Sequence, residues 1–314
     1  MSKGLVLLNM GGPNNLDEVE VFLTNMFNDP NIITIKNDFM RSVIAWLITK
    51  SRKKEATANY EALGGKSPLV GYTKNLIKKL QMALPDTCVT FAMRYTPPFA
   101  KAAVDELLTH GVKELCIIPL YPHYSSTTTK SSLEDFLKVA ENSFKKISVM
   151  ERFYDNEAYN LAIIEKIEAA LNGKDASKFE LIYSAHSLPQ KIVDRGDPYQ
   201  KEVLAHADIL SAMLEKKGYF FASKEVAYQS KLGPVKWLAP ELGSALKKLE
   251  NKNALIVPLS FTLDNSETEF ELDIEYREIA KKLGVLDYLV AACPNASDAF
   301  VAALLELNCP HSKT

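Results

Sequence analysis

The stretch 181-LIYSAHSLPQKIVDRGDPY-199 places a lone histidine just beyond a short apolar run. Leu181, Ile182 and Tyr183 have the apolar character of a buried strand, which predicts a strand at residues 180–184. His186 follows this strand without the neighbours of a Ser-His-Asp triad and without a metal-ligand spacing. In parallel α/β sheets, ligands bind beyond the carboxyl ends of the strands. The stretch therefore predicts a parallel sheet with His186 at its ligand-binding edge.

Similar apolar runs alternate with helical patterns along the whole chain, which is typical of parallel sheets covered by helices on both faces. Further strands are expected at 4–9, 88–94, 114–120, 148–153, 225–229, 254–260 and 288–292. Helices are expected at 17–27, 99–110, 133–140, 157–171, 202–217 and 267–283. The alternation predicts an α/β fold class with Rossmann-like parallel sheets flanked by helices.

The two halves of the chain resemble each other in the segments that end their strands. LVLLNMGGP parallels ELIYSAHSLP, CVTFAMRYTPP parallels EVAYQSKLGP, and ELCIIPLYP parallels ALIVPLSFT. A period of this length indicates two similar α/β domains, although generic strand and loop chemistry also produces loose likenesses. We expect an N-terminal domain at 1–154 and a C-terminal domain at 155–314 that carries His186, with a cleft between them lined by strand ends.

The first half carries an additional segment at 31–66. It includes FMRSVIAWLITKSRKK, which is apolar at helical spacing and ends in basic residues. Composition favours a helix that packs its apolar face on the core. The alternatives are the lip of an apolar pocket or a contact with a membrane surface.

The composition is that of a soluble globular protein, because 47% of its 314 residues are hydrophobic and 24% are charged. The net charge of −2 does not indicate nucleic-acid binding, and no apolar run approaches the ~18 residues of a membrane span. We expect a cytoplasmic protein. No C-x-x-C pair occurs, so we expect unpaired thiols and no iron–sulfur cluster from Cys88, Cys116, Cys293 and Cys309.

A row of acids lies in 261-FTLDNSETEFELDIEYRE-278. Glu267, Glu271 and Glu275 are four residues apart, so a helix places them on one face, and Asp264 precedes them. Such a row is ordinarily a solvated face, but the apolar residues among these acids suggest a packed helix. The row then predicts a path for a divalent cation. One imidazole and one carboxylate are too few for a tight structural metal site, and they suit a metal that passes through.

The remaining motifs give weaker signals. The loop Met10-Gly11-Gly12-Pro13 is not G-x-G-x-x-G, which counts against a nucleotide-dependent enzyme. Gln229-Ser230-Lys231 follows a predicted strand and is therefore expected at the ligand-binding edge. His110 and His206 fall in helical patterns and are expected on the surface.

Six motifs together resemble the ferrochelatase family, whose members insert ferrous iron into a porphyrin at the end of haem synthesis. In order, they are LLNMGGP, YEALGGKSPL, LYPHYS, SAHSLPQKIVDRGDPY, YQSKLGPVKWLAP and FTLDNSETEFELDIEY. They span nearly the whole chain. The resemblance implies two chelatase-type domains, with His186 and Glu267 as the catalytic pair that also contacts the metal. The relay of metal would then involve Asp264, Glu271 and Glu275.

The resemblance also implies a set of residues that bind the porphyrin. Met10 resembles the pocket methionine of the protoporphyrin-using branch, where the coproporphyrin-using branch usually has tyrosine. Lip residues that contact the porphyrin and its propionates are implied at Arg52, Tyr60 and Ser67. Pocket-lining residues are implied at Arg94, Tyr95, Trp237 and Phe261. Many relatives read Asp-His-x-Glu where this chain has Asn265 in place of the histidine, so a mechanism with two imidazoles is in doubt.

The function implied by the resemblance is insertion of Fe²⁺ into protoporphyrin IX to form protohaem, by bending the macrocycle and accepting the pyrrole protons. Fe²⁺ is then a substrate, and no organic cofactor is implied. The expected partners are the porphyrin, Fe²⁺ and, transiently, a membrane surface at the lip, with no nucleic acid and an open oligomeric state. The alternatives are a coproporphyrin or cobalt chelatase, or a tetrapyrrole or metal carrier without turnover.

Overall fold

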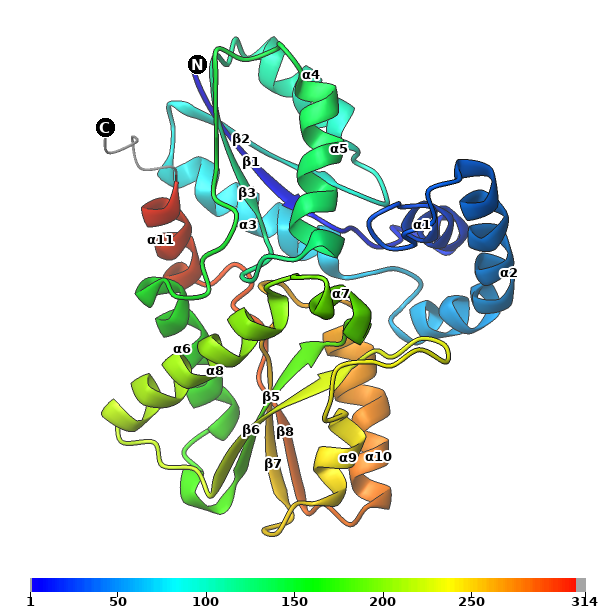
Figure 1. Ribbon diagram of the computed structural model, residues 1–314. Helices are drawn as coiled ribbons and strands as arrows, with labels where there is room; N and C mark the ends of the chain where they lie inside the picture. The colour runs from blue at the N-terminus through cyan, green and yellow to red at the C-terminus, as the bar shows by residue number, and fades with distance from the viewer. Residues whose placement is uncertain (1, 309–314) are drawn as a thin grey trace. The chain divides into compact units, whose positions relative to one another are not determined.

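The computed structural model describes residues 2–308, which fold into two compact units (Figure 1). One unit comprises residues 2–152 together with 304–308, and the other comprises Phe153–Ala303. Each unit contains one four-stranded parallel sheet flanked by helices. The predicted fold class, two Rossmann-like parallel sheets, is therefore confirmed.

In the first unit the sheet order is β2-β1-β3-β4, and every neighbouring pair is parallel. Its elements are β1 (Lys3–Asn9), α1 (Glu18–Phe27), α2 (Asp38–Ala62), α3 (Leu69–Ala83), β2 (Thr87–Met93), α4 (Ala100–Thr109), β3 (Glu114–Pro119), the π-helix η1 (Ser126–Lys130), α5 (Ser131–Ala140) and β4 (Lys146–Val149). Figure 1 shows α4 and α5 on one face of this sheet and α3 on the other.

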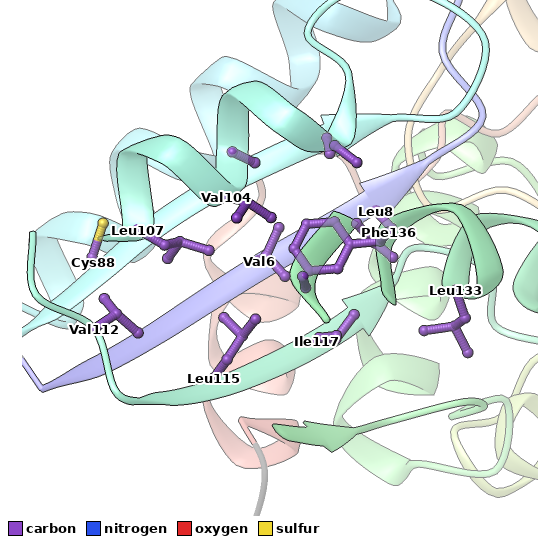
Figure 2. Close-up of a cluster of buried hydrophobic side chains, with 14 residues drawn as sticks. Val6, Leu8, Cys88, Val104, Leu107, Val112, Leu115, Ile117, Leu133 and Phe136 are labelled. Carbon is purple, nitrogen blue, oxygen red and sulfur yellow. The ribbon is translucent and has the colours of Figure 1, made fainter. Parts of the chain in front are cut away.

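The core of the first unit forms where the apolar strands meet α4 and α5. Figure 2 shows Val104 and Leu107 of α4 and Phe136 of α5 around Val6 of the central strand. Val6, Leu107 and Ile117 are completely buried. Burying each such side chain contributes roughly 1.5–3 kcal/mol, which explains why near-continuous apolar runs form these strands.

The second unit repeats this topology, with sheet order β6-β5-β7-β8 and parallel neighbours throughout. Its elements are α6 (Glu157–Leu171), the short 3₁₀ helix η2 (Ala176–Lys178), β5 (Glu180–His186), α7 (Gln190–Asp194), α8 (Tyr199–Lys216), β6 (Ser223–Gln229), α9 (Leu242–Lys247), β7 (Asn253–Pro258), the π-helix η3 (Glu267–Glu275), α10 (Tyr276–Lys282), β8 (Asp287–Val290) and α11 (Asp298–Leu307), which runs into the first unit's segment. In both units a π-helix follows the third strand, so the similarity of the two halves extends beyond the strands.

Several sequence-based expectations differ from the structure. The helices α3, α7, α9 and α11 are additional to the predicted ones, and β4 begins two residues before its expected start at 148. His206 is completely buried and its Nε2 lies 2.7 Å from Oδ1 of Asn160, so its expected surface position is wrong. A helical pattern cannot show that α8 is covered on the side that carries this histidine.

The cysteine prediction holds only in part. Cys88 and Cys293 are free and buried, whereas Cys116 is disulfide-bonded, so the expectation of unpaired thiols is wrong for Cys116. Pairing depends on the Cα separation in the fold, which sequence spacing does not give. Cys309 lies outside the described residues.

The helix α2 displays its bulky apolar side chains instead of burying them. It packs on α1 and buries Ala45, Thr49 and Tyr60. Phe39 is 77% exposed and Trp46 is 51% exposed, so the interpretation of an apolar face packed on the core is wrong for this face. Among residues 2–308, no helix is both long and apolar enough to cross a bilayer.

Candidate functional site

His186 is the last residue of β5, and its main chain is held by two hydroxyl groups. Its backbone N–H donates to Oγ of Ser260 at 3.2 Å. The hydroxyl of Tyr199 donates to the His186 carbonyl at 2.9 Å and lies 2.6 Å from the same Oγ. Tyr199 ends the stretch that contains His186, so the loop folds back to fix the strand end.

Glu267 reaches His186 from the first turn of η3. Its Oε2 lies 2.7 Å from Nδ1 of the imidazole. The side chain of His186 is 39% exposed and that of Glu267 is 19% exposed, so the imidazole is the more accessible of the two. The structure thus brings together the two residues that the sequence indicated as a pair.

The pair shifts the acidity of both groups. Burial alone would lower the pKa of His186, but the charge of Glu267 and its hydrogen bond outweigh burial and raise that pKa. Burial alone would raise the pKa of Glu267, but the charge of His186 and the hydrogen bonds that the carboxylate accepts lower it. The arrangement therefore favours an ionised carboxylate beside a basic imidazole.

Ser230, directly after β6, connects Glu267 with Glu271. Its Oγ lies 3.0 Å from Oε2 of Glu267 and also hydrogen-bonds Oε2 of Glu271. Its backbone N–H donates to Oε1 of Glu271 at 2.8 Å, and its φ of 64° places it in the left-handed region. Non-glycine residues in this region are uncommon and are found at functional sites. Its position after a predicted strand indicated the edge of the sheet, and no sequence signal indicated this bridging role.

Glu271 is half-buried one step further along η3 from the His186–Glu267 pair. Burial and then the charge of Glu267 raise its pKa to about 7. Gln229, which is completely buried, has its Nε2 3.4 Å from Oε2 of Glu271. The sequence alone indicates no role for this amide, although its position at the end of β6 is next to the site.

The acid row lies on a π-helix, which the sequence did not predict. A π-helix has i→i+5 hydrogen bonds and hence more residues per turn than an α-helix, so residues four apart remain close to one line along the axis. Glu267 and Glu271 are half-buried, whereas Glu275 is exposed. The three carboxylates therefore form a row that runs from the His186–Glu267 pair to solvent.

Asp264, the fourth acid of the predicted relay, is occupied elsewhere. It accepts hydrogen bonds from Oγ1 of Thr268 at 2.9 Å, from the backbone N–H of Cys293 at 3.1 Å and from the side-chain amide of Asn295 at 2.5 Å. It is also only 7% exposed. These contacts join the start of η3 to the segment after β8. A relay role for Asp264 stays a prediction without geometric support.

Arg94 and Tyr95 form a polar cluster with Asp29 in the first unit. Arg94 makes ion pairs at 3.2 Å with Asp29 and at 3.2 Å with Asp135, and the Tyr95 hydroxyl donates to Asp29 at 2.9 Å. Tyr95 is buried, whereas Arg94 lines a cavity of about 440 Å³. This cavity is lined by none of the other predicted porphyrin contacts, so the pocket-lining roles of Arg94 and Tyr95 stay predictions.

The Met10 loop rests on Ser67 and Tyr60. A Cβ added at Gly12 would lie 2.5 Å from Oγ of Ser67, so only glycine permits this close approach. The Ser67 backbone N–H donates to the carbonyl of Pro13 at 2.7 Å. Ser67 and Tyr60 are buried, while Met10 is half-buried at the end of β1. The two predicted lip residues thus support the loop that presents Met10.

The other predicted porphyrin contacts are accessible. Arg52 on α2 is 43% exposed at its side chain and forms an i,i+3 ion pair with Glu55 at 3.2 Å. Trp237 and Phe261 are half-buried in the second unit. Among the described residues, no group of three or more His, Cys, Asp or Glu side chains could hold a metal ion.

Comparisons with known proteins match nearly the whole chain to one family. The family model described as ferrochelatase matches residues 2–312. A ferrochelatase of a Nitratiruptor species is 60% identical over 307 residues, covering 97% of this chain and 98% of the relative. A ferrochelatase of Sulfurimonas denitrificans is 49% identical and covers 97% of this chain and 98% of the relative.

Solved structures of other proteins have a fold similar to that of this chain. SirB from Bacillus subtilis with Fe³⁺ has a TM-score of 0.57 at 12% identity, covering 98% of this chain and 94% of SirB. CbiX, described as the terminal enzyme of sirohaem biosynthesis in denitrifying bacteria, has a TM-score of 0.54 at 14% identity, with 97% of both chains covered. At these identities the likeness concerns the fold alone.

Proposed function

Because the chain belongs to the ferrochelatase family, we propose that it inserts Fe²⁺ into protoporphyrin IX to form protohaem. The observation that carries this proposal is the 2.7 Å contact between Nδ1 of His186 and Oε2 of Glu267 at the carboxyl end of β5. Met10 supports protoporphyrin over coproporphyrin as the substrate, since the coproporphyrin-using branch usually carries tyrosine at this position.

The proton balance of the reaction assigns a role to each member of the pair. Forming haem from the free-base porphyrin and Fe²⁺ releases two pyrrole protons and transfers no electron, so no organic cofactor is required. A carboxylate only accepts hydrogen bonds, so Glu267 keeps the proton of a neutral His186 on Nδ1. The lone pair then lies on Nε2, which accepts a pyrrole proton as a general base. The raised pKa of His186 makes this nitrogen a better acceptor.

Glu267, Ser230 and Glu271 continue this proton route. After Nε2 takes up a proton, the Nδ1 proton can pass to Oε2 of Glu267, which then donates to Oγ of Ser230 while the hydroxyl proton of Ser230 passes to an ionised Glu271. When Glu271 is protonated, the bridging hydroxyl donates to Glu267, and when Glu271 is ionised, the hydroxyl can donate to it instead. The pKa of about 7 lets Glu271 take up and release protons near neutral pH. Glu275 is exposed at the outer end of the row. The same row suits the approach of Fe²⁺, for which carboxylate oxygens are ligands.

The segment 31–66 is proposed as a lip that contacts the porphyrin. The exposed side chains of α2 form a stripe at helical spacing that comprises Phe39, Met40, Val43, Trp46 and Leu47. Arg52 follows the stripe on the same helix and offers a positive charge for a propionate. The stripe would also suit the boundary of a lipid surface, and co-sedimentation with anionic vesicles would separate this use from porphyrin binding.

The test is anaerobic incubation with Fe²⁺ and protoporphyrin, followed by absorbance, with coproporphyrin and Co²⁺ in parallel. We expect protein-dependent formation of protohaem. Activity of His186→Ala should fall by at least about 10²-fold, as is typical for a lost acid–base group. His110→Ala, which alters an exposed histidine at the end of α4, serves as the matched control and should retain activity. Porphyrin binding without turnover would indicate a carrier and contradict the proposal.

A further inference from the structure

Asn265 has its polar groups engaged at the start of η3. Its Oδ1 accepts the backbone N–H of Glu267 at 2.8 Å, and its Nδ2 donates to the carbonyl of Leu263 at 3.1 Å. Its own backbone N–H donates to Oγ1 of Thr268 at 3.0 Å. The residue is only 8% exposed. The side chain of Asn265 is therefore committed to the backbone on both sides of the residue.

The bond to Oδ1 of Asn265 holds the backbone of Glu267. The first N–H groups of a helix have no partner within the helix, and an acceptor such as an asparagine side chain satisfies one of them. Two hydrogen bonds join Asn265 and Thr268. The backbone N–H of Asn265 donates to Oγ1 of Thr268, and the carbonyl of Asn265 accepts the backbone N–H of Thr268 at 3.2 Å. The reciprocal arrangement resembles a capping box. It holds the residue whose Oε2 contacts His186.

The first unit shows a similar contact at the start of its π-helix, where the bonded residue is Thr127, the second residue of η1. Oγ of Ser125 accepts the backbone N–H of Thr127 at 3.2 Å, which is the same i→i+2 contact at the start of η1. The carbonyl of Ser125 accepts the N–H of Thr128 at 3.3 Å, matching the carbonyl of Asn265. In both units, therefore, a short polar side chain accepts a backbone N–H two residues further on, at the start of a π-helix.

We propose that Asn265 is a positioning residue that orients Glu267 toward His186 by accepting its backbone N–H at the start of η3, and that the reaction uses the single imidazole of His186. The inference rests on the proposed function, because Glu267 is significant only for that reaction. A hydrogen-bond acceptor of suitable length at position 265 is then sufficient. An imidazole there is not needed.

The test compares Asn265→Ala, which removes the acceptor, with Asn265→Ser, which supplies the acceptor that the first unit uses. Ser125→Ala is the matched control, since it removes the same kind of cap from η1. For each folded variant, kcat, the KM values for Fe²⁺ and porphyrin, and the melting temperature are measured. If Asn265→Ala does not fold, Asn265→Gly replaces it, because glycine is better tolerated at N-caps.

We expect Asn265→Ala to lower kcat by about tenfold or more at an unchanged porphyrin KM, as a misplaced catalytic group does. Asn265→Ser should recover most of this loss, and Ser125→Ala should lower the melting temperature without lowering kcat. A wild-type kcat in Asn265→Ala, an equal loss in Asn265→Ser, or an equal loss in Ser125→Ala would overturn the inference.

A crystal structure of Asn265→Ala gives a readout that does not depend on turnover. A separation between Nδ1 of His186 and Oε2 of Glu267 beyond hydrogen-bond range supports the inference, and an unchanged contact overturns it. An inactive wild-type protein, in contrast, would contradict the proposed function and leave this structural outcome decisive for Asn265.

Discussion

At the scale of single residues, two carboxylates that share one serine hydroxyl are driven to different protonation states. Two carboxylates that contact one hydroxyl are close enough for the negative charge of either to disfavour ionisation of the other. The imidazole of His186 stabilises the charge on Glu267, so the pKa of Glu267 is lowered, while burial and the charge of Glu267 raise the pKa of Glu271 to about 7. A pair of acids whose environments separate their pKa values is typical of sites that move protons.

Substitution of Glu267 should damage turnover more than substitution of Glu275. Glu267→Gln keeps the size but removes the charge beside His186, so kcat should collapse while porphyrin binding is largely retained. Glu275→Gln alters an exposed carboxylate and should act mildly, chiefly by raising the iron concentration required. Titrations in iron and in porphyrin for each folded variant measure both effects. Greater damage from Glu275→Gln would reverse the assigned roles.

The raised pKa of Glu271 predicts a pH-dependent cost in stability. Its folded pKa of about 7 lies above the ordinary 4.5, so between these values the folded state binds more protons than the unfolded state. The contribution of this group to stability is therefore fully present below about pH 4.5 and is lost as the pH rises through about 7. Glu271→Gln should stabilise the protein near pH 8 by on the order of 1 kcal/mol, and the difference should shrink toward pH 5.

Urea unfolding of wild type and Glu271→Gln at several pH values between about 5 and 8 tests this prediction. Glu275→Gln provides the control, since it removes a carboxylate of the same helix that is exposed to solvent. A stability difference for Glu271→Gln that stays constant with pH would contradict the assignment.

At the scale of elements, η3 and α2 each depart from the ordinary α-helix of a soluble protein. η3 is a π-helix of nine residues, and π-helical segments are frequent at functional sites. The α2 helix reverses the usual amphipathic pattern, because its buried residues include the small Ala45 and Thr49 while its bulky apolar residues face outward. A stripe of exposed apolar side chains is typical of a surface that contacts a ligand, another protein or a membrane.

Arg52 tests the role of α2 as a lip. Its guanidinium pairs only with exposed Glu55 among the ion pairs of the described chain, so Arg52→Ala should cost little stability. If the side chain binds a propionate, the variant should raise the KM for porphyrin while leaving kcat largely unchanged. Lys54→Ala removes an exposed positive charge from the same helix and is the matched control. An unchanged dependence on porphyrin concentration would count against this role.

At the scale of the whole molecule, two units of the same strand order each bury a core of their own. In the first unit α4 and α5 cover one face of the sheet, and in the second α9, η3 and α10 do so. The π-helix of the second unit thus contributes Leu272 to the core while presenting Glu267 and Glu271 to the site. The packing of Leu272 in the core fixes this helix and thereby the positions of Glu267 and Glu271.

A pair of aliphatic substitutions tests this description of the core. Ile117→Ala removes a completely buried side chain from the central region of the first sheet and should cost about 2–5 kcal/mol in unfolding free energy. Leu286→Ala alters a leucine that is 83% exposed and should change stability by no more than about 0.5 kcal/mol. Urea unfolding measures both. Equal losses would show that burial does not govern these positions.

Local pattern and chain order were enough to predict the α/β class and the repeated strand pattern of the two halves, and the resemblance to ferrochelatases implied the pairing of His186 with Glu267. Apolar periodicity reports burial directly, and parallel strands bring their carboxyl ends to one edge whatever the details of the loops. The six motifs were likewise enough to indicate the ferrochelatase family before any geometry was known. None of these features depends on the exact distance between two side chains.

The meeting of particular polar groups, in contrast, required the three-dimensional arrangement. Ser230 joins Glu267 to Glu271 through a left-handed backbone after β6, and the side chain of Asn265 accepts the backbone N–H of Glu267. Likewise, Asp264 binds the segment after β8, and the bulky face of α2 is exposed instead of packed. Hydrogen-bond partners and covered faces depend on elements distant in sequence, and no local pattern encodes the distance between them.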